Sequence, residues 1–350
     1  MGHNRGGGSG GGMGGTGGGM GGTGGTGGGM GGGGGMGGGA CFVYPGAPST
    51  PGIVTPDVAF NRGVYMRGSM RMDDGRSVTV WGFTDGGMGG MMGGAFPSPP
   101  IRVRQGQIVH TRLTNQGMMW LHTIHHHGIE PSHENDGVGH TSFDVDGTYT
   151  YQWRASNAGT YFYHCHTNTV LHAEMGMYGV LIVDPADGSK KAYTNGPAYD
   201  VEAIWAADEF DSRWHNYGWA AGSCGGDMGF NNLNADYFII SGVDGASSAL
   251  TDPRVAVTMT QGQSLLVRYI NAGYYPQRIN FGALTATAVA SDGRPLPQSV
   301  SMNSLKTSAA ERYDFIINPT ATGTYEVVIE FLDWVTGAVR GRARTRITVN

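Results

Sequence analysis

The chain has few charged residues, few cysteines and no long hydrophobic run, and each shortage excludes a class of protein. Lys and Arg number only 22 and the net charge is −5, so no basic patch is available for nucleic acid or an anionic membrane surface. No apolar segment approaches the ~20 residues that cross a bilayer, and the N-terminus has no apolar signal-peptide core. We therefore expect no nucleic-acid partner and no membrane span. We expect a periplasmic or extracellular location, with any export signal absent from this chain.

Cysteine is sparse, at three residues. Cys165 lies within a histidine cluster, which leaves Cys41 and Cys224, each in a Gly-rich context. These two could form one disulfide if the protein is exported. Two buried or free thiols are the alternative, because the sequence alone does not place their Cα atoms within bridging distance. Both alternatives stay open.

The hydrophobic residues are arranged for strands rather than for helices. They make up 39% of the 350 residues and fall in short runs of Val, Ile, Tyr and Phe bounded by Gly, Pro, Asn and Asp. No long amphipathic helical stretch competes with this pattern. Since two domains of ~150 residues are expected at this length, we predict an all-β protein with two β-domains.

An internal repeat indicates where the two domains lie. The matching positions are Gln105 with Gln261, Arg112 with Arg268, Asn115 with Asn271, and Gly159-Thr-Tyr161 with Gly323-Thr-Tyr325. We therefore predict β-domains at residues 41–187 and 196–350, after a low-complexity segment at residues 1–40.

Two short runs concentrate the residue types that bind metals. The first extends from His122 to His127, and the second is Tyr163-His-Cys-His166, followed by His172, Met175 and Met177. Imidazole, thiolate and thioether donors in one place suit copper. The sequence therefore predicts a copper-binding domain at residues 41–187.

The second copy of the repeat lacks these residues and serves as an internal control. Aligned without gaps, His122, His125 and His127 fall at Arg278, Phe281 and Ala283, and His164, Cys165 and His166 fall at Val328, Ile329 and Glu330. Because the scaffold residues persist where the ligands are absent, the histidines are not needed to build the fold. We interpret residues 196–350 as a metal-free domain.

Strand parity separates the candidate ligands into two groups, because successive side chains point to opposite faces of a strand. His164 and His166 point one way and Cys165 points the other, so one strand can serve two metal sites. By the same parity His125 and His127 share a face.

The buried side of this strand is predicted to hold a blue copper site. His122 falls on the opposite face from its histidine neighbours and can join Cys165. Together with His172 and a weak axial thioether, these residues make the trigonal His₂Cys site of blue copper. For the axial ligand we favour Met177, and we expect Met175 to be packing.

The motif H-x-x-H-x-H-G, followed by H-C-H, a later His and Met-Tyr-Gly-Val-Leu-Ile-Val, resembles the multicopper oxidases, the family of laccases and related two-domain enzymes. The resemblance covers both β-domains, roughly residues 55–350. It implies a cupredoxin fold, a Greek-key β-sandwich or barrel, for each domain. It also implies copper as the cofactor, and a small-molecule or metal-ion reductant and O₂ as the reaction partners.

The resemblance also implies a role for each candidate residue. The type 1 copper would be held by His122, Cys165, His172 and Met177, with His125 as a type 2 ligand and His127, His164 and His166 as type 3 ligands. Asp136 resembles the family's acid that relays protons to bound oxygen, a role that needs a carboxylate hydrogen-bonded through water.

The second domain departs from the family pattern. A trinuclear copper centre in this family uses more histidines than the four that stand at matching positions here. The second domain instead resembles the metal-free middle domain of three-domain members. We therefore expect the cluster to be completed by another chain, in a homo-oligomer or in a complex with a different copper-domain chain.

The remaining histidines are interpreted without a metal. They are His110, His126, His133, His140 and His215, which we expect to be packed or solvated. Zinc also binds Cys and His tetrahedrally. It leaves the methionine after His172 and the H-C-H strand unexplained.

Residues 1–40 are almost entirely Gly, with Thr and Met spaced along them. Such a segment buries too little apolar surface to offset the entropy lost on ordering, so we predict a disordered Gly/Met-rich tail. Spaced thioethers are also soft ligands for Cu(I). A plain linker and a weak Cu(I)-gathering tail therefore both stay open.

Three functions are compatible with the sequence. The first is an oxidase that takes electrons at a type 1 copper and passes them along His164-Cys165-His166 to O₂. The second is a blue-copper electron carrier or copper-binding protein without oxygen chemistry. The third is a nitrite-reductase-like type 2 site on His127 and His164, which needs a further histidine that the second domain does not offer.

Overall fold

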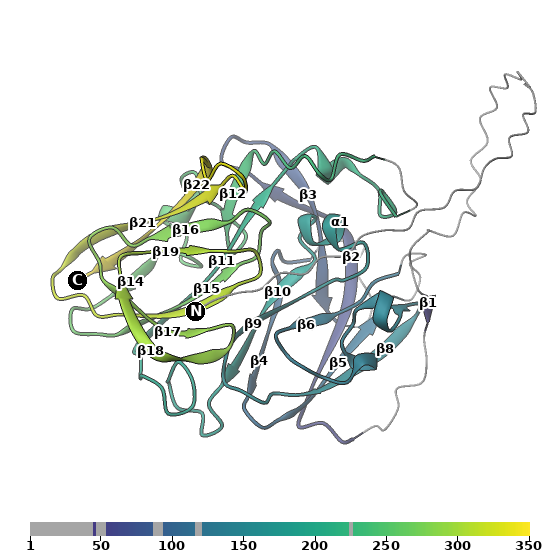
Figure 1. Cartoon of the computed structure of the whole chain (residues 1–350), viewed down its shortest axis with the longest axis horizontal. Helices are drawn as coiled ribbons and strands as arrows, with labels where there is room; N and C mark the ends of the chain where they lie inside the picture. The colour runs from purple at the N-terminus through teal and green to yellow at the C-terminus, as the bar shows by residue number, and fades with distance from the viewer. Residues whose placement is uncertain (1–44, 47–53, 87–93, 116–120, 224–226) are drawn as a thin grey trace, which may run out of the picture. The chain divides into compact units, whose positions relative to one another are not determined.

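The computed structural model describes residues 45–46, 54–86, 94–115, 121–223 and 227–350 (Figure 1). The predicted tail and the cysteine pair Cys41 and Cys224 lie outside the described residues. Within the described ranges every long element is a strand, and the one α-helix, α1 (Thr169–Glu174), has six residues. No helix in these ranges is long and apolar enough to cross a membrane. The all-β prediction is confirmed.

The first half of the described chain is built from mixed sheets. Its strands are β1 (Pro45–Gly46), β2 (Val58–Arg71), β3 (Ser77–Asp85), β4 (Ser98–Arg104), β5 (Ile108–Thr114), β6 (His125–His127), β7 (Asp144–Val145), β8 (Thr148–Arg154), β9 (Gly159–His164) and β10 (Tyr178–Asp184). One sheet has the order β3-β2-β5-β8 and the other β4-β10-β9-β6, while β1 pairs with β7. Short 3-10 helices, η1 (His133–Asn135) and η2 (Gly139–Thr141), follow β6.

The second half repeats this plan with longer sheets. Its strands are β11 (Val201–Phe210), β12 (Tyr237–Ile240), β13 (Val243–Asp244), β14 (Val257–Met259), β15 (Leu265–Asn271), β16 (Gln277–Asn280), β17 (Ala286–Ser291), β18 (Arg294–Met302), β19 (Ser304–Thr307), β20 (Arg312–Ile317), β21 (Gly323–Leu332) and β22 (Val339–Val349). Their orders are β13-β12-β11-β15-β20-β17-β18 and β14-β22-β21-β16-β19. The 3-10 helices here are η3 (Trp214–Asn216) and η4 (Ser248–Leu250).

Each half buries its own apolar core, because alternate side chains of each strand point inward. In β8, for example, Tyr149, Tyr151 and Trp153 are buried while the residues between them are partly exposed. No ladder among the described strands joins β1–β10 to β11–β22. We keep the limits 41–187 and 196–350 as proposed domains, and a smaller apolar cluster that includes Phe162 of β9 and Ile270 of β15 packs them together.

The strand register corrects one detail of the repeat. His125 pairs with His164 across β6 and β9, whereas Asn280 pairs with Val328 across β16 and β21. The predicted counterpart of His125, Phe281, is therefore one residue too far along, because His125 comes ten residues after Asn115, whereas Asn280 comes nine residues after Asn271, the match of Asn115 in the repeat. The conclusion holds, since asparagine replaces the histidine at the corrected position.

A buried arginine ties the halves together. Arg268 of β15 is fully buried, and its Nε donates to Glu202 Oε1 at 2.7 Å. Its Nη1 donates to Thr160 Oγ1 of β9 at 3.0 Å and lies 3.5 Å from Asp314 Oδ2. Thr160 also donates to Asp314. Removing one partner of such a pair leaves an uncompensated buried charge.

We expect Arg268→Ala to lower the free energy of unfolding of the metal-free protein by ~3–5 kcal/mol, because the buried Asp314 loses its cation, while Glu202 keeps its pair with Arg102. The matched control is Arg278→Ala. The Arg278 side chain pairs with Glu330 and is 45% exposed, so this variant should lose less than ~1 kcal/mol of unfolding free energy. Urea unfolding followed by circular dichroism measures both. Equal losses in the two variants would contradict a role for burial.

Candidate metal centre

The pairing of β6 with β9 brings the candidate ligands together. His125 lies opposite His164, and His127 lies opposite Phe162. His125 and His127 are partly exposed on one face of β6, while His126 between them is buried on the other. The predicted parity is confirmed, because a residue on each of two paired strands contributes to the same face.

Three imidazoles meet on the partly exposed face. One ring nitrogen from each of His125, His127 and His164 lies within 4.8 Å of the other two. His127 Nδ1 and His164 Nε2 are 3.3 Å apart. His166 lies next to this group, with its ring centroid 5.5 Å from that of His125. The structure therefore gathers all four predicted histidines, three of them more tightly than the fourth.

Backbone carbonyls fix two of these rings. His125 Nδ1 donates to Asp136 O at 2.7 Å, and His164 Nδ1 donates to Cys165 O at 2.9 Å. Each bond leaves the other ring nitrogen, Nε2, free to bind a metal, which is how outer contacts orient metal-binding histidines. Asp136 also places its carboxylate 3.3 Å from His125 Nδ1. The predicted acid is therefore in contact with a predicted ligand.

Burial favours the neutral form of three imidazoles on this face, those of His127, His164 and His166. It lowers the pKa of His127 to about 3, with the charge of Arg312 as the next cause. It also lowers the pKa of His164 well below its usual value and the pKa of His166 in the same direction. A neutral imidazole has a lone pair for a metal ion, so these rings are prepared as ligands.

The opposite side of β9 holds a second group. His122, Cys165 and His172 are fully buried, and each offers a donor atom within 4.8 Å of the others. Cys165 Sγ is 3.6 Å from His122 Nδ1 and 3.4 Å from His172 Nδ1. Burial raises the pKa of the Cys165 thiol to about 11. A cation among these donors would favour the thiolate.

Different parts of the chain position these three donors. His122 forms an isolated bridge with Val145. Cys165 follows β9, and His172 lies on α1. His172 Nε2 donates to Trp219 O at 3.2 Å, which leaves Nδ1 facing the sulfur. Trp219 belongs to the segment between β11 and β12, and no local sequence signal pointed to it.

Two methionines lie in the apolar cluster around Cys165. Met175 and Met177 are both fully buried there. The backbone of Met177 is the more closely tied to the candidate ligands. Its N–H donates to His172 O at 3.1 Å and its carbonyl accepts from Cys165 N–H at 3.0 Å. Met177 as the axial ligand stays a proposal supported by this backbone placement.

The other histidines are placed largely as predicted. His126 Nε2 lies 3.0 Å from Thr111 Oγ1, and His110 is buried. His133 is 78% exposed beside Glu134. His140 has its ring 5.8 Å from that of His166. Gly139, His140 and His166 line a cavity of about 270 Å³. Water and other small molecules can therefore reach His166 on the histidine face.

The comparison with known families decides how these two groups should be understood. The model of the multicopper oxidase family matches residues 77–188, which include every candidate ligand. Residues 77–188 belong to the multicopper oxidase family. Copper is the cofactor of this family, and the buried His122–Cys165–His172 group has the donor set of a type 1 copper.

Relatives and solved structures extend the similarity beyond this segment. Copper resistance protein A of Pseudomonas syringae pv. tomato is 27% identical over 288 residues, which are 72% of this chain and 46% of that protein. L-ascorbate oxidase of Cucumis sativus is 38% identical over 131 residues, 35% of this chain and 20% of that protein. The chain thus spans about half the length of the first curated relatives that it matches.

The fold similarity covers both halves. The crystal structure of blue copper oxidase from Nitrosomonas europaea superposes with a TM-score of 0.66 at 25% identity, over 83% of this chain and 86% of that one. The predicted cupredoxin-like fold of the multicopper oxidases is confirmed by this match.

The thiol of Cys165 is expected to give the copper-loaded protein a blue colour. Charge transfer from thiolate to copper needs this sulfur, so Cys165→Ser should remove the visible absorption band. Circular dichroism should show the fold retained, since the second half folds with Ile329 at the position predicted to match Cys165. A band that survives the substitution would rule out the type 1 assignment.

His126 predicts a pH dependence of stability that is separate from metal binding. Burial, and then the charges of His125 and Arg62, lower the pKa of His126 to about 3. The unfolded chain takes up this proton below its ordinary pKa of ~6.5 and the folded chain does not, so this group destabilises the fold as pH falls from ~6.5 towards ~3. Above pH ~6.5 His126 is neutral in both the folded and the unfolded chain, so this loss of stability is absent there.

We expect His126→Gln to lessen this loss in the metal-free protein. The difference in unfolding free energy between variant and parent should change by up to ~1.4 kcal/mol per pH unit below pH ~6.5. His133→Gln, at an exposed histidine, controls for the removal of an imidazole. Parallel curves for His126→Gln and the parent in urea unfolding at several pH values would show that His126 titrates normally.

Proposed function

We propose that the protein is a copper oxidoreductase that takes electrons from a reductant at the His122–Cys165–His172 group. It passes them to O₂ at the face formed by His125, His127, His164 and His166. The observation that carries this proposal is the position of Cys165, which follows β9 between two histidines of the opposite face. One strand therefore joins the two groups through adjacent residues.

Bound copper would supply one-electron transfer at the buried group and oxygen reduction at the histidine face. The chain itself supplies the connection, because His164 Nδ1 donates to the carbonyl of Cys165 at 2.9 Å. The peptide bonds from Cys165 to its two neighbours are the shortest covalent link between the groups. Burial excludes water from the sulfur, while His125 and His127 remain partly accessible.

Asp136 has the placement of a proton donor for this face. Its carboxylate lies 3.3 Å from His125 Nδ1 and is 32% exposed. It can therefore exchange protons with solvent while it faces the histidines. Gly137, with a φ of +71°, makes this approach possible. A Cβ there would lie 2.1 Å from the carbonyl oxygen of Ile124.

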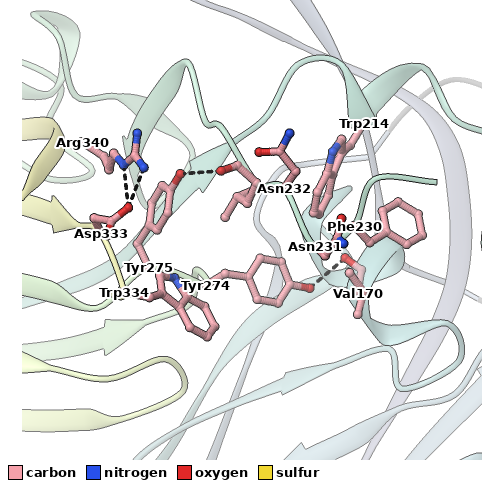
Figure 2. A pocket seen from close by; sticks show the side chains of 11 residues that line it. Val170, Trp214, Phe230, Asn231, Asn232, Tyr274, Tyr275, Asp333, Trp334 and Arg340 are labelled. Carbon is pink, nitrogen blue, oxygen red and sulfur yellow. Dashed lines mark hydrogen bonds and ion pairs between the residues drawn. The ribbon is translucent and has the colours of Figure 1, made fainter. Parts of the chain in front are cut away.

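An organic reductant is the better supported electron donor. A cavity of about 470 Å³ borders α1 at Val170, two residues before His172. Figure 2 shows Tyr274 pointing towards Val170, and its hydroxyl donates to Val170 O at 2.8 Å. The acid in the lining, Asp333, is paired with Arg340 at 2.5 Å. Aromatic walls and a neutralised carboxylate favour an uncharged aromatic molecule over a metal ion.

Another chain must complete a larger copper cluster. The second half offers Asn280, Val328 and Glu330 where the first half has histidines. An isologous dimer presents the same surface from both subunits. Two first halves meeting face to face would therefore contribute four histidines each. A complex with a different copper-domain chain is the other arrangement, and in both cases we retain the periplasmic or extracellular location as part of the proposal.

A blue-copper electron carrier or copper-binding protein is the second candidate function. The absence of ligands in the second half favours it, because a monomer then has only one half of a cluster. Copper analysis combined with oxygen uptake distinguishes the two. A blue monomer without oxygen uptake would favour the carrier.

We expect His125→Ala to abolish oxygen reduction while the blue absorption band remains, since His125 lies on the opposite side of β9 from the sulfur. Oxygen uptake with a chemical reductant, visible absorption and light scattering for oligomeric state are measured on one preparation. His133→Ala, at an exposed histidine of the following loop, is the control and should keep full activity. A monomeric protein that reduces O₂ with a single bound copper would refute the shared cluster.

A further inference from the structure

We propose that Trp219 is a positioning residue of the buried donor group, through which the second half sets how tightly that group holds oxidised copper. Trp219 lies in the segment after β11, residues 211–223, and is not a candidate ligand itself. This inference deepens the proposed function and rests on copper bound at the buried group. It makes no use of oxygen chemistry.

The helix that carries His172 is too short to be stable by itself. α1 has six residues, and helices shorter than ~12–15 residues are marginal in water without tertiary contacts. Asn168 is at its N-cap, where an asparagine side chain commonly accepts a hydrogen bond from the first helical turn. Here the Asn168 side chain makes no such bond. The helix therefore depends on other segments for its position.

Those contacts come from the second half. Asn168 Nδ2 donates to Trp219 O at 3.2 Å and to Ala221 O at 2.9 Å. At the other end of the helix, Glu174 Oε1 accepts from the backbone N–H of Asp211 at 2.6 Å. Both ends of α1 are therefore tied to the segment after β11.

Trp219 contacts both histidine-bearing parts of the donor group. Its carbonyl oxygen accepts from His172 Nε2 at 3.2 Å. Its indole Nε1 donates to the carbonyl of Leu121, the residue before His122, at 3.1 Å. The indole is buried, and its ring centroid lies 5.9 Å from that of His172. One residue of the second half therefore connects the two segments that carry the imidazoles.

The hydrogen bond to His172 has two consequences for a metal ion. It keeps the proton on Nε2, so the lone pair of Nδ1 faces the sulfur of Cys165, 3.4 Å away. A carbonyl that accepts from a ligand imidazole also makes that ring a stronger donor. Cu(II) gains more from a stronger donor than Cu(I) does, because its charge is higher. Loss of this contact should therefore raise the reduction potential of the copper.

A tryptophan that only fills the core would behave differently. Trp219 does pack in the apolar core of the first half, and buried aromatic rings contribute strongly to folding stability. Packing alone predicts a lower free energy of unfolding and an unchanged reduction potential. The reduction potential therefore separates a positioning role from a packing role.

Trp219→Phe removes the indole N–H and keeps an aromatic ring in the core. We expect the Cu(II) dissociation constant of the buried group to rise about tenfold, as is typical when an outer partner of a ligand is lost, with the Cu(I) affinity unchanged. The reduction potential should then rise by ~59 mV, which equals a tenfold change for one electron. Potentiometric titration of the visible absorption band measures the potential, and competition with a copper chelator measures the affinity.

Asn168→Gly tests the same contacts from the first half. It removes the donor to Trp219 O and Ala221 O without backbone strain, because Asn168 has a φ of +43°, which glycine adopts readily. The potential should rise, as in Trp219→Phe. The double variant should shift the potential by less than the sum of the two single shifts, because both changes act on one network. If Trp219→Phe does not fold, Asn168→Gly decides the test.

Tyr217→Phe is the matched control. Tyr217 lies in the same segment, and its hydroxyl donates to Met228 O at 3.0 Å, so this variant should keep the parent's potential. A parental potential in Trp219→Phe and Asn168→Gly, or additive shifts in the double variant, would overturn the positioning role. A parent protein without a blue absorption band would instead refute copper at the buried group. Failure of this inference and failure of the proposed function are therefore distinguishable.

Discussion

The pairing of β6 with β9 is the constraint on which the rest of the site depends. It places His125 opposite His164, and strand alternation then sends Cys165 to the other side. The two donor groups are consequently back to back, one buried and one partly open. A slip of one residue in β6 or β9 would turn the side chains of that strand to the opposite face. The packing of apolar side chains against these strands therefore has to hold one register.

The second half contributes to the site although its described residues contain no group of metal ligands. Its Trp219 carbonyl accepts from His172, Tyr274 bonds the first residues of α1, and Arg312 reaches the strand of His127. Arg268 connects the halves through Thr160. The second half therefore covers and orients parts of the metal-binding half.

The two donor groups differ in burial, and this difference divides their chemistry. The sulfur site is closed, so copper held there would be shielded from direct contact with a substrate. The imidazole face is partly exposed and adjoins a cavity, so it can accept an outside ligand. An enzyme that separates electron entry from oxygen chemistry needs this combination, and a carrier needs only the closed site.

The sequence by itself determined the strands, the duplication and the two-sided placement of His164, Cys165 and their neighbours, because alternation along a strand is a local property. Only the tertiary structure decided that Asn280 is the counterpart of His125, that His166 lies outside the tight group of three histidines, and that Arg312 lies beside that group. These facts depend on loop lengths and on packing between distant segments. Such contacts leave no periodic signal in the sequence.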